Sequence, residues 1–168
     1  IDMEWKHFTF IGLGLIGGSL AKAIKKVYPH AHISVLDKDA RSVKIALSEG
    51  IVDQELHTVK EIDQDTELLF LCTPVEQNRI FLTDLQTILP PCTIITDVGS
   101  TKTSIMKEAE KLGLSSQFIG GHPMAGAEVS GYRASDSLLL ENAYYLLTPG
   151  KSFPLELTNK MLAFLSSI

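Results

Sequence analysis

Apolar runs alternate with amphipathic stretches along most of this 168-residue chain. Short, mostly apolar runs predict buried strands, and they fall at residues 7–12, 33–36, 68–72, 93–96, 117–120 and 143–147. Apolar residues at helical spacing predict helices, which fall at residues 15–28, 39–48, 75–88, 101–112 and 154–168. Strands that are apolar throughout need cover on both faces, and the helices between them supply it. The pattern therefore predicts an α/β fold, a doubly wound and mostly parallel sheet with helices on both faces.

The connection between the first predicted strand and helix contains the spacing Gly-x-Gly-x-x-Gly, at Gly12, Gly14 and Gly17. The first glycine permits a tight turn, the second lets a pyrophosphate approach the backbone, and the third allows the helix to pack closely on the strand. Free N–H groups and the positive dipole end of the helix attract the phosphates. The spacing alone is common, but a strand before it and a helix after it are typical of dinucleotide binding. We therefore expect a Rossmann-type domain.

Two further positions follow predicted strands at the same edge of the sheet. Asp37 lies 20 residues after Gly17, at the carboxyl end of the second predicted strand. A carboxylate there accepts hydrogen bonds from the adenosine ribose and repels a 2′-phosphate, which favours NAD over NADP. The alternative is a cap for the next helix, although Asp39 is better placed for that role. Thr73 and Pro74 follow a later strand and are expected over the cofactor, where the proline also suits a helix start.

The composition is that of a globular protein with a core, at 45% hydrophobic and 21% charged residues. A net charge of −5 argues against nucleic acid or a membrane surface as a partner. The sequence has no apolar run long enough to span a bilayer and no opening signal-peptide pattern, so we expect a cytoplasmic protein. Cys72 and Cys92 lack partners at ligand spacing, so we expect buried free thiols and no metal site.

Two loops after later predicted strands carry candidate chemistry. The loop that begins at Asp97 contains Gly99 and Ser100 but lacks the spacing of a Walker phosphate loop. In the second loop, His122 follows two glycines and precedes Pro123, which favours an extended backbone. An imidazole at the mouth of the sheet, beside a cofactor, is well placed as a general base. A histidine bonded to backbone carbonyls is the structural alternative.

These residues lie in segments that resemble the prephenate/arogenate dehydrogenase family of tyrosine biosynthesis. The matching segments are Gly12-Leu-Gly-Leu-Ile-Gly-Gly-Ser-Leu20, Asp97-x-Gly-Ser100-x-Lys102, Gly121-His-Pro-Met-Ala-Gly-Ala-Glu-x-Ser-Gly131, and Asn142 with the strand 143–147 and Thr148-Pro149. Together they span nearly the whole chain. The resemblance implies NAD-dependent oxidative decarboxylation of prephenate to 4-hydroxyphenylpyruvate, with this chain as the NAD-binding N-terminal domain.

The resemblance also implies roles for individual side chains. His122 is the base that takes the proton from the substrate's ring hydroxyl, and Ser100 helps to position that hydroxyl. Glu128 is the acidic residue that controls access to the substrate pocket. The cofactor contacts that we expect are Gly12, Leu13, Gly14, Leu15, Ile16, Gly17, Asp37, Thr73, Pro74 and Gly99.

Members of this family continue into a helical domain that supplies dimer contacts and an arginine for a substrate carboxylate. We therefore expect residues 1–150 to form the dinucleotide-binding domain. Residues 151–168 are then its last helix or the start of a truncated dimerisation domain, and the full-length protein is expected to be a homodimer. Two alternatives remain open: an arogenate dehydrogenase of the same family, and a non-catalytic NAD-binding regulatory module. The second would have no need of Ser100 and His122.

Overall fold

The computed structural model describes residues 5–125 and 129–168. Within them one sheet has the strand order β3-β2-β1-β4-β5-β6-β7. Its strands are β1 (His7–Ile11), β2 (His32–Leu36), β3 (Gln54–Leu56), β4 (Leu68–Leu71), β5 (Ile94–Asp97), β6 (Phe118–Pro123) and β7 (Tyr145–Pro149). The α-helices are α1 (Gly14–Val27), α2 (Ala40–Ser48), α3 (Val75–Leu85), α4 (Thr103–Lys111) and α5 (Leu155–Ser167). Two short 3-10 helices are η1 (Val59–Glu61) and η2 (Tyr132–Ala134).

The first strand lies inside the sheet, between β2 and β4. Phe8 pairs in register with Ile33 of β2 on one side and with Leu68 of β4 on the other. All neighbouring strands are parallel except β6 and β7, which are antiparallel. From β1 the chain adds β2 and β3 on one side, and it then crosses back to add β4 on the other side of β1. The strand order therefore reverses between β1 and β4. In doubly wound sheets, the carboxyl ends of the strands at such a point border the ligand crevice.

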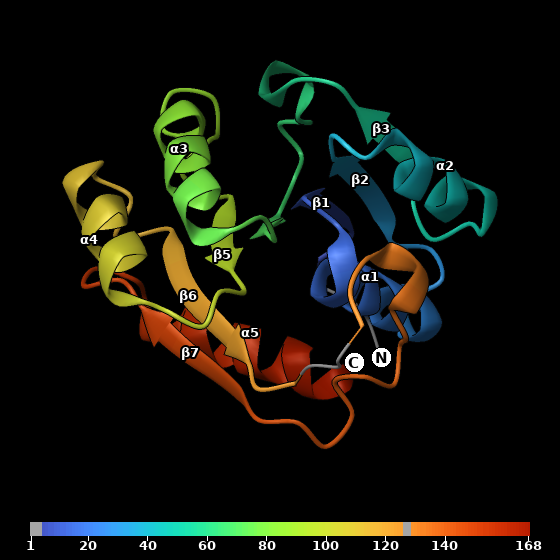
Figure 1. The fold of residues 1–168 in the computed structure, drawn as a ribbon. Coiled ribbons are helices and arrows are strands. Elements are labelled where there is room, and N and C mark those ends of the chain that lie inside the picture. Colours follow the sequence, from blue (N-terminus) through green and yellow to red (C-terminus); the bar gives the residue numbers. More distant parts are fainter. Residues whose placement is uncertain (1–4, 126–128) are drawn as a thin grey trace.

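Helices cover both faces of the sheet (Figure 1). On one face, α1, α2 and α5 pack over Phe8, Phe10 and Phe70, and the rings of Phe10 and Phe70 stack with centroids 4.7 Å apart. On the other face, α3 and α4 pack over Leu69 and Ile95. The predicted doubly wound, mostly parallel α/β architecture is confirmed.

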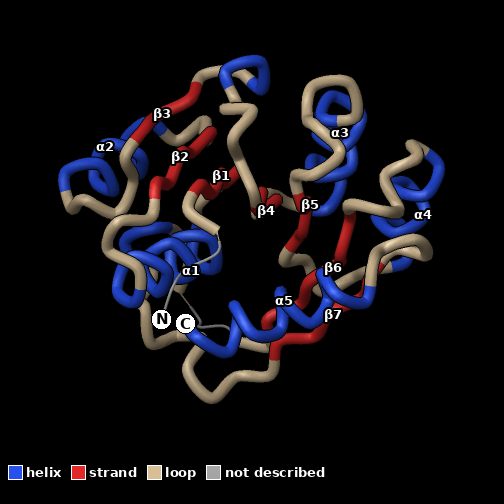
Figure 2. The backbone as a smooth tube through the Cα atoms, turned by 180° about the vertical axis from the view of Figure 1, so that it is seen from behind, coloured by secondary structure: helices blue, strands red, loops and turns tan. Residues whose placement is uncertain are grey.

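The last helix, α5, belongs to the first of these two layers. The ring of Phe164 lies 5.3 Å from that of Trp5, 5.4 Å from that of Phe8 and 6.1 Å from that of Tyr28. Met161, one turn earlier, is fully buried. In Figure 2 the helix runs across the sheet from β7 toward α1. The apolar side of α5 is thus covered by the described part of the chain.

The structure corrects the sequence pattern at several points. The polar strand Gln54–Leu56 was not predicted, because its three residues carry no apolar run. The last strand begins at Tyr145 rather than at residue 143 and runs antiparallel to β6. The predicted helices 75–88 and 101–112 are shorter, at Val75–Leu85 and Thr103–Lys111. Cys92 is exposed rather than buried, since it lies in the turn before β5.

Candidate functional site

The glycine turn between β1 and α1 has two packed glycines and one open glycine. Gly12 has φ +87°, and a β-carbon on it would lie 2.9 Å from Cγ2 of Thr73. A β-carbon on Gly17 would lie 2.9 Å from the carbonyl oxygen of Gly12 and 3.1 Å from Cβ of Cys72. Gly14 has φ +58°, but no atom lies within 4 Å of the position its β-carbon would take. Gly12 and Gly17 are therefore required by packing, whereas Gly14 leaves free space at the first turn of α1.

That free space belongs to a cavity of about 840 Å³, which is in the range of small-molecule and cofactor sites. It lies over the carboxyl ends of the central strands and the start of α3. Six of the ten expected cofactor residues line it: Gly12, Leu13, Gly14, Asp37, Thr73 and Pro74. The lining does not include the other four, Leu15, Ile16, Gly17 and Gly99. Residues that were not predicted from the sequence also line it, among them Glu55, His57, Thr58, Val59, Gln77 and Phe81.

Asp37 has a structural partner within the glycine turn. One of its carboxylate oxygens accepts the backbone N–H of Leu13 at 2.8 Å, and the other accepts the N–H of Asp39 at 2.8 Å. Asp39 in turn caps α2 through the N–H groups of Arg41 and Ser42, which confirms it as the capping residue. Asp37 is therefore not the cap of α2, and it lines the cavity at the end of β2.

The turn after β4 is fixed by a buried amide. The side-chain oxygen of Asn78 accepts the N–H of Thr73 at 3.1 Å and also accepts the Thr73 hydroxyl. Asn78 is fully buried, and its amide nitrogen donates to the carbonyl of Leu71 at 3.4 Å. Pro74 immediately precedes α3 as its N-cap, one position before the first helical turn. Both residues predicted to lie over the cofactor are thus held at one edge of the cavity.

A buried ion pair joins the end of β5, the loop that follows it, and strand β6. The fully buried Asp97 carboxylate accepts the Lys102 ammonium, the N–H of Gly99 at 3.3 Å and the N–H of Gly121 at 3.0 Å. Burial raises the pKa of the Asp97 carboxyl, and the Lys102 charge opposes that rise. Burial likewise lowers the pKa of the Lys102 ammonium, against the opposing effect of Asp97. Sequence reasoning quoted both residues in a matching segment but gave them no role in the site.

The ends of β5 and β6 are where Ser100 and His122 were predicted to meet. Thr96 pairs with Ile119 in the parallel ladder, so both loops leave the same edge of the sheet. Ser100 is exposed three positions after β5, and His122 is half-buried near the end of β6. A β-carbon on Gly121 would lie 2.5 Å from the Asp97 carbonyl oxygen, so the ends of β5 and β6 pack too closely for any side chain at Gly121. Glu128 lies outside the described residues.

Tyr145 contributes a polar group that the sequence did not reveal. Its ring packs against Gly121, since a β-carbon on that glycine would lie 3.1 Å from Cε1 of the ring. Its buried hydroxyl has no hydrogen-bond partner among the described residues. Burial raises the pKa of this hydroxyl, and the neighbouring Cys72 and Asp97 act in the same direction. Because β7 is antiparallel to β6, Tyr145 stands beside the strand that carries His122.

Among residues 5–125 and 129–168, no group of three or more histidine, cysteine or carboxylate side chains is arranged to hold a metal ion. No helix in this part of the chain combines the length and apolar character needed to cross a membrane.

Comparisons with known proteins fit this geometry. A family profile described as "Prephenate dehydrogenase, nucleotide-binding domain" matches residues 20–168. The prephenate dehydrogenase of Bacillus subtilis is 41% identical over 142 residues, which cover 83% of this chain. The chain spans only 38% of that relative's own length.

Solved structures agree with the sequence relatives. The prephenate dehydrogenase of Aquifex aeolicus, in complex with hydroxyphenyl propionate and NAD+, superposes with a TM-score of 0.91 at 27% identity. That match covers 99% of this chain and 58% of the other. The arogenate dehydrogenase of Synechocystis gives a TM-score of 0.86 at 31% identity, covering 95% of this chain and 56% of the other.

Proposed function

Because the chain belongs to the family of prephenate dehydrogenase nucleotide-binding domains, we propose that it is the NAD-binding part of a prephenate dehydrogenase. The reaction is the oxidative decarboxylation of prephenate to 4-hydroxyphenylpyruvate, a step of tyrosine biosynthesis. The chain spans well under two thirds of its relatives, so the activity is that of a longer protein that contains it.

The observation that carries the nucleotide part of this proposal is the open side of Gly14. This glycine lies at the start of α1, where free N–H groups and the helix dipole favour phosphate, and it borders the cavity. Leu13 and the following residues of the turn, Leu15, Ile16 and Gly17, would present backbone to the pyrophosphate. Asp37 would accept the hydroxyls of the adenosine ribose. Thr73, Pro74 and Gly99 would lie along the nicotinamide half.

When bound, NAD supplies the group that accepts hydride from the substrate. The neutral imidazole of His122 accepts the proton of the substrate's ring hydroxyl. At the same time, the ring carbon that carries this hydroxyl gives up its hydride to NAD. The ring carboxylate leaves as CO₂, and its bonding electrons complete the aromatic ring and place a negative charge on the ring oxygen. That oxygen then takes the proton back from the His122 imidazolium, which gives the phenol and restores the neutral imidazole. Ser100 orients the hydroxyl toward His122, and Asp97 with Lys102 holds the two loops at a fixed separation.

A second substrate is favoured by one specific observation. The similar structure from Synechocystis is an arogenate dehydrogenase, and arogenate carries the same ring that is oxidised in prephenate. The described residues include no feature that separates the two substrates. A non-catalytic regulatory module is less well supported, because it would need neither a serine nor a histidine beside the nicotinamide.

The extent of the domain and the assembly are also part of the proposal. Residues 1–150 form the dinucleotide-binding domain, and α5 completes it, as the packing of Phe164 and Met161 supports. Glu128 controls access to the substrate. The longer protein forms a homodimer through regions beyond this chain.

The test of the catalytic role is a pH–rate profile of the longer protein carrying His122→Asn. Wild-type kcat/KM for prephenate should fall as the pH is lowered, because a protonated imidazole cannot accept a proton. The variant should lose on the order of 10²–10⁴-fold in kcat and lose the acidic limb, while its NAD affinity stays unchanged. His30→Asn is the matched control, since His30 is exposed in the turn between α1 and β2. A variant that keeps wild-type kcat, or keeps the same acidic limb, would show that another group is the base.

A further inference from the structure

The chain makes a long excursion between β6 and β7. An antiparallel hairpin needs only about two to five connecting residues, whereas this connection runs from residue 124 to residue 144. One of its ends is held by the hairpin itself, through the bond from the N–H of Met124 to the carbonyl of Tyr144 at 2.7 Å. Its middle crosses to α1, where residues 132–136 lie against the helix; we call these residues the strap.

Gly18 is the point of closest approach between the strap and α1. A β-carbon on Gly18 would lie 2.7 Å from the hydroxyl of Ser135 and 2.9 Å from the ring of Tyr132. The backbone does not require glycine here, because Gly18 lies within the regular helix and does not have a positive φ. Glycine weakens a helix interior. Contact with the strap is therefore what excludes a larger residue.

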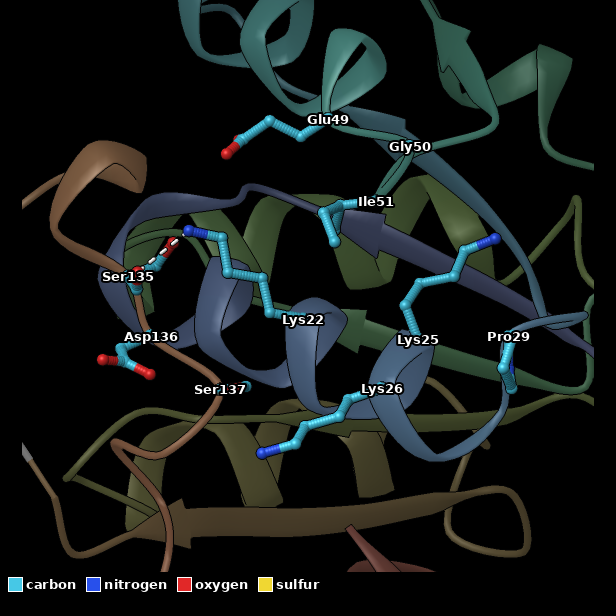
Figure 3. A pocket seen from close by; sticks show the side chains of 10 residues that line it. All are labelled: Lys22, Lys25, Lys26, Pro29, Glu49, Gly50, Ile51, Ser135, Asp136 and Ser137. Carbon is cyan, nitrogen blue, oxygen red and sulfur yellow. Dashed lines mark hydrogen bonds between the residues drawn. The ribbon is translucent and has the colours of Figure 1, made fainter.

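The neighbouring residues of α1 bond directly to the strap. The hydroxyl of the fully buried Ser19 accepts the N–H of Asp136 at 3.0 Å. One turn after Gly18, the ammonium of Lys22 donates to the carbonyl of Ser135 at 2.9 Å, as Figure 3 shows. The same ammonium lies 4.6 Å from the centre of the Tyr132 ring, within the range of a cation–π contact.

The other side of the strap is anchored in the core. Tyr132 is only 1% exposed and ranks among the largest buried side chains of the described chain. Its hydroxyl donates to Glu49, at the end of α2, at 2.8 Å. The strap is thus fixed from two helices, although it lies in the connection that starts beside His122.

We propose that Gly18 and Ser19 are positioning residues for the substrate: they dock the strap on α1 and so fix the far end of the chain segment that leaves His122. The inference rests on the proposed dehydrogenase function. It separates two roles on one helix. The first turn, at Gly14, serves the nucleotide, and the next turn, at Gly18 and Ser19, serves the substrate side.

The experiment uses the longer protein and compares Gly18→Ala with Gly14→Ala, two equal changes one turn apart. The dissociation constant of NAD is measured by titration, and KM and kcat for prephenate are measured at saturating NAD. Gly18→Ala should raise the KM for prephenate on the order of tenfold and leave NAD affinity within about twofold. Gly14→Ala should do the reverse. Adding Ser135→Gly to Gly18→Ala removes two of the three closest contacts, leaves that with the Tyr132 ring, and should bring the KM part of the way back. Ser135→Gly alone is the control.

Several outcomes would overturn the proposal. They are an unchanged KM in Gly18→Ala, an equal loss of NAD affinity, or no recovery in the double variant. If circular dichroism shows that Gly18→Ala fails to fold, Ser19→Ala is the deciding variant, since it removes only the acceptor of the Asp136 N–H. A raised KM for prephenate with unchanged NAD affinity in Ser19→Ala supports the positioning role. An unchanged KM overturns it. A wild-type protein that oxidises neither prephenate nor arogenate would instead overturn the proposed function, before any variant is compared.

Discussion

At the scale of single residues, four glycines at the start of α1 have three kinds of surroundings. Gly12 and Gly17 are enclosed by the turn after β4, Gly18 by the strap, and Gly14 by no atom within 4 Å. A side chain added at Gly14 would therefore meet a bound ligand, whereas one added at Gly12, Gly17 or Gly18 would meet the protein itself. Because its φ is +58°, a β-branched residue there would also strain the backbone, so alanine is a cleaner probe than valine.

Asp37 provides a test of nucleotide choice. Asp37→Asn keeps an oxygen that can accept the N–H of Leu13, but it removes the charge that repels a 2′-phosphate. We expect the affinity for NADP relative to NAD to rise on the order of tenfold, because each tenfold step needs only about 1.4 kcal/mol. Dissociation constants for both nucleotides, measured by titration of the purified protein, check this.

A matched control for that change is Asp65→Asn, which removes one charge from an exposed loop. It should leave the NADP-to-NAD ratio where the wild type has it. If Asp37→Asn leaves the NADP-to-NAD affinity ratio unchanged, the Asp37 carboxylate stabilises the glycine turn but does not contact the ribose.

At the scale of elements, the sequence predicts the apolar strands and their helices well, because both report burial directly. It fails for Gln54–Leu56, a short edge strand that pairs with β2 and buries only Leu56, too little to form an apolar run. Because this strand was not predicted, the part of the cavity lining that follows it, His57 and Thr58, was not predicted either. The direction of β7 was hidden for a related reason: its alternating half-buried and exposed residues do not reveal which way a strand runs.

The candidate site likewise has a part that the sequence predicts and a part that it does not. Gly12, Gly14 and Gly17 have a fixed spacing that reflects backbone geometry, so the sequence alone indicates their roles. The Asp97–Lys102 pair depends on burial, and the Tyr145 hydroxyl depends on the antiparallel pairing of β7. Neither is visible before the strands are arranged in space.

The N-cap of α2 yields a prediction about pH. Hydrogen bonds from the Ser42 hydroxyl and N–H lower the pKa of the Asp39 carboxyl. The folded state thus holds the carboxylate in its charged form, so this stabilisation is present above the unfolded pKa and is lost as the pH falls through the lowered value. Asp39→Asn should lower the melting temperature at neutral pH, and Asp39→Ala should lower it further.

Thermal unfolding followed by circular dichroism, at neutral pH and at a pH below the lowered pKa of Asp39, measures both effects. The difference between wild type and Asp39→Asn should shrink at the acidic pH, because the protonated carboxyl is neutral like the asparagine amide. A difference of equal size at both pH values would mean that the charge of Asp39 adds nothing to the cap.

At the scale of the whole molecule, the question is how much of an enzyme this chain contains. Prephenate carries two carboxylates, and the chain has three arginines. Arg79 already pairs with Glu76 and Glu108, and Arg41 lies on the exposed side of α2. Arg133 is exposed in the strap, so at most one arginine stands near the substrate side for two carboxylates.

We expect residues 1–168 alone to bind NAD but to oxidise prephenate poorly. Its kcat/KM should lie on the order of 10²-fold or more below that of the longer protein, since positioning of the substrate is incomplete. Steady-state assays of NADH formation with both proteins, after NAD binding has been verified for each, measure the ratio. Equal kcat/KM values would show that the chain already carries a complete substrate site.

The ion pair formed by Asp97 and Lys102 also constrains how this sequence can diverge. Loss of either partner leaves the other charge in the sheet interior without compensation, whereas joint replacement by two neutral residues of similar size avoids that penalty. Related sequences should therefore exchange the two positions together rather than one at a time. Through the bond to Gly121, such an exchange would also release the strand that carries His122. We therefore expect the pair to change as one unit, together with the Ser100 loop and the His122 strand that it joins.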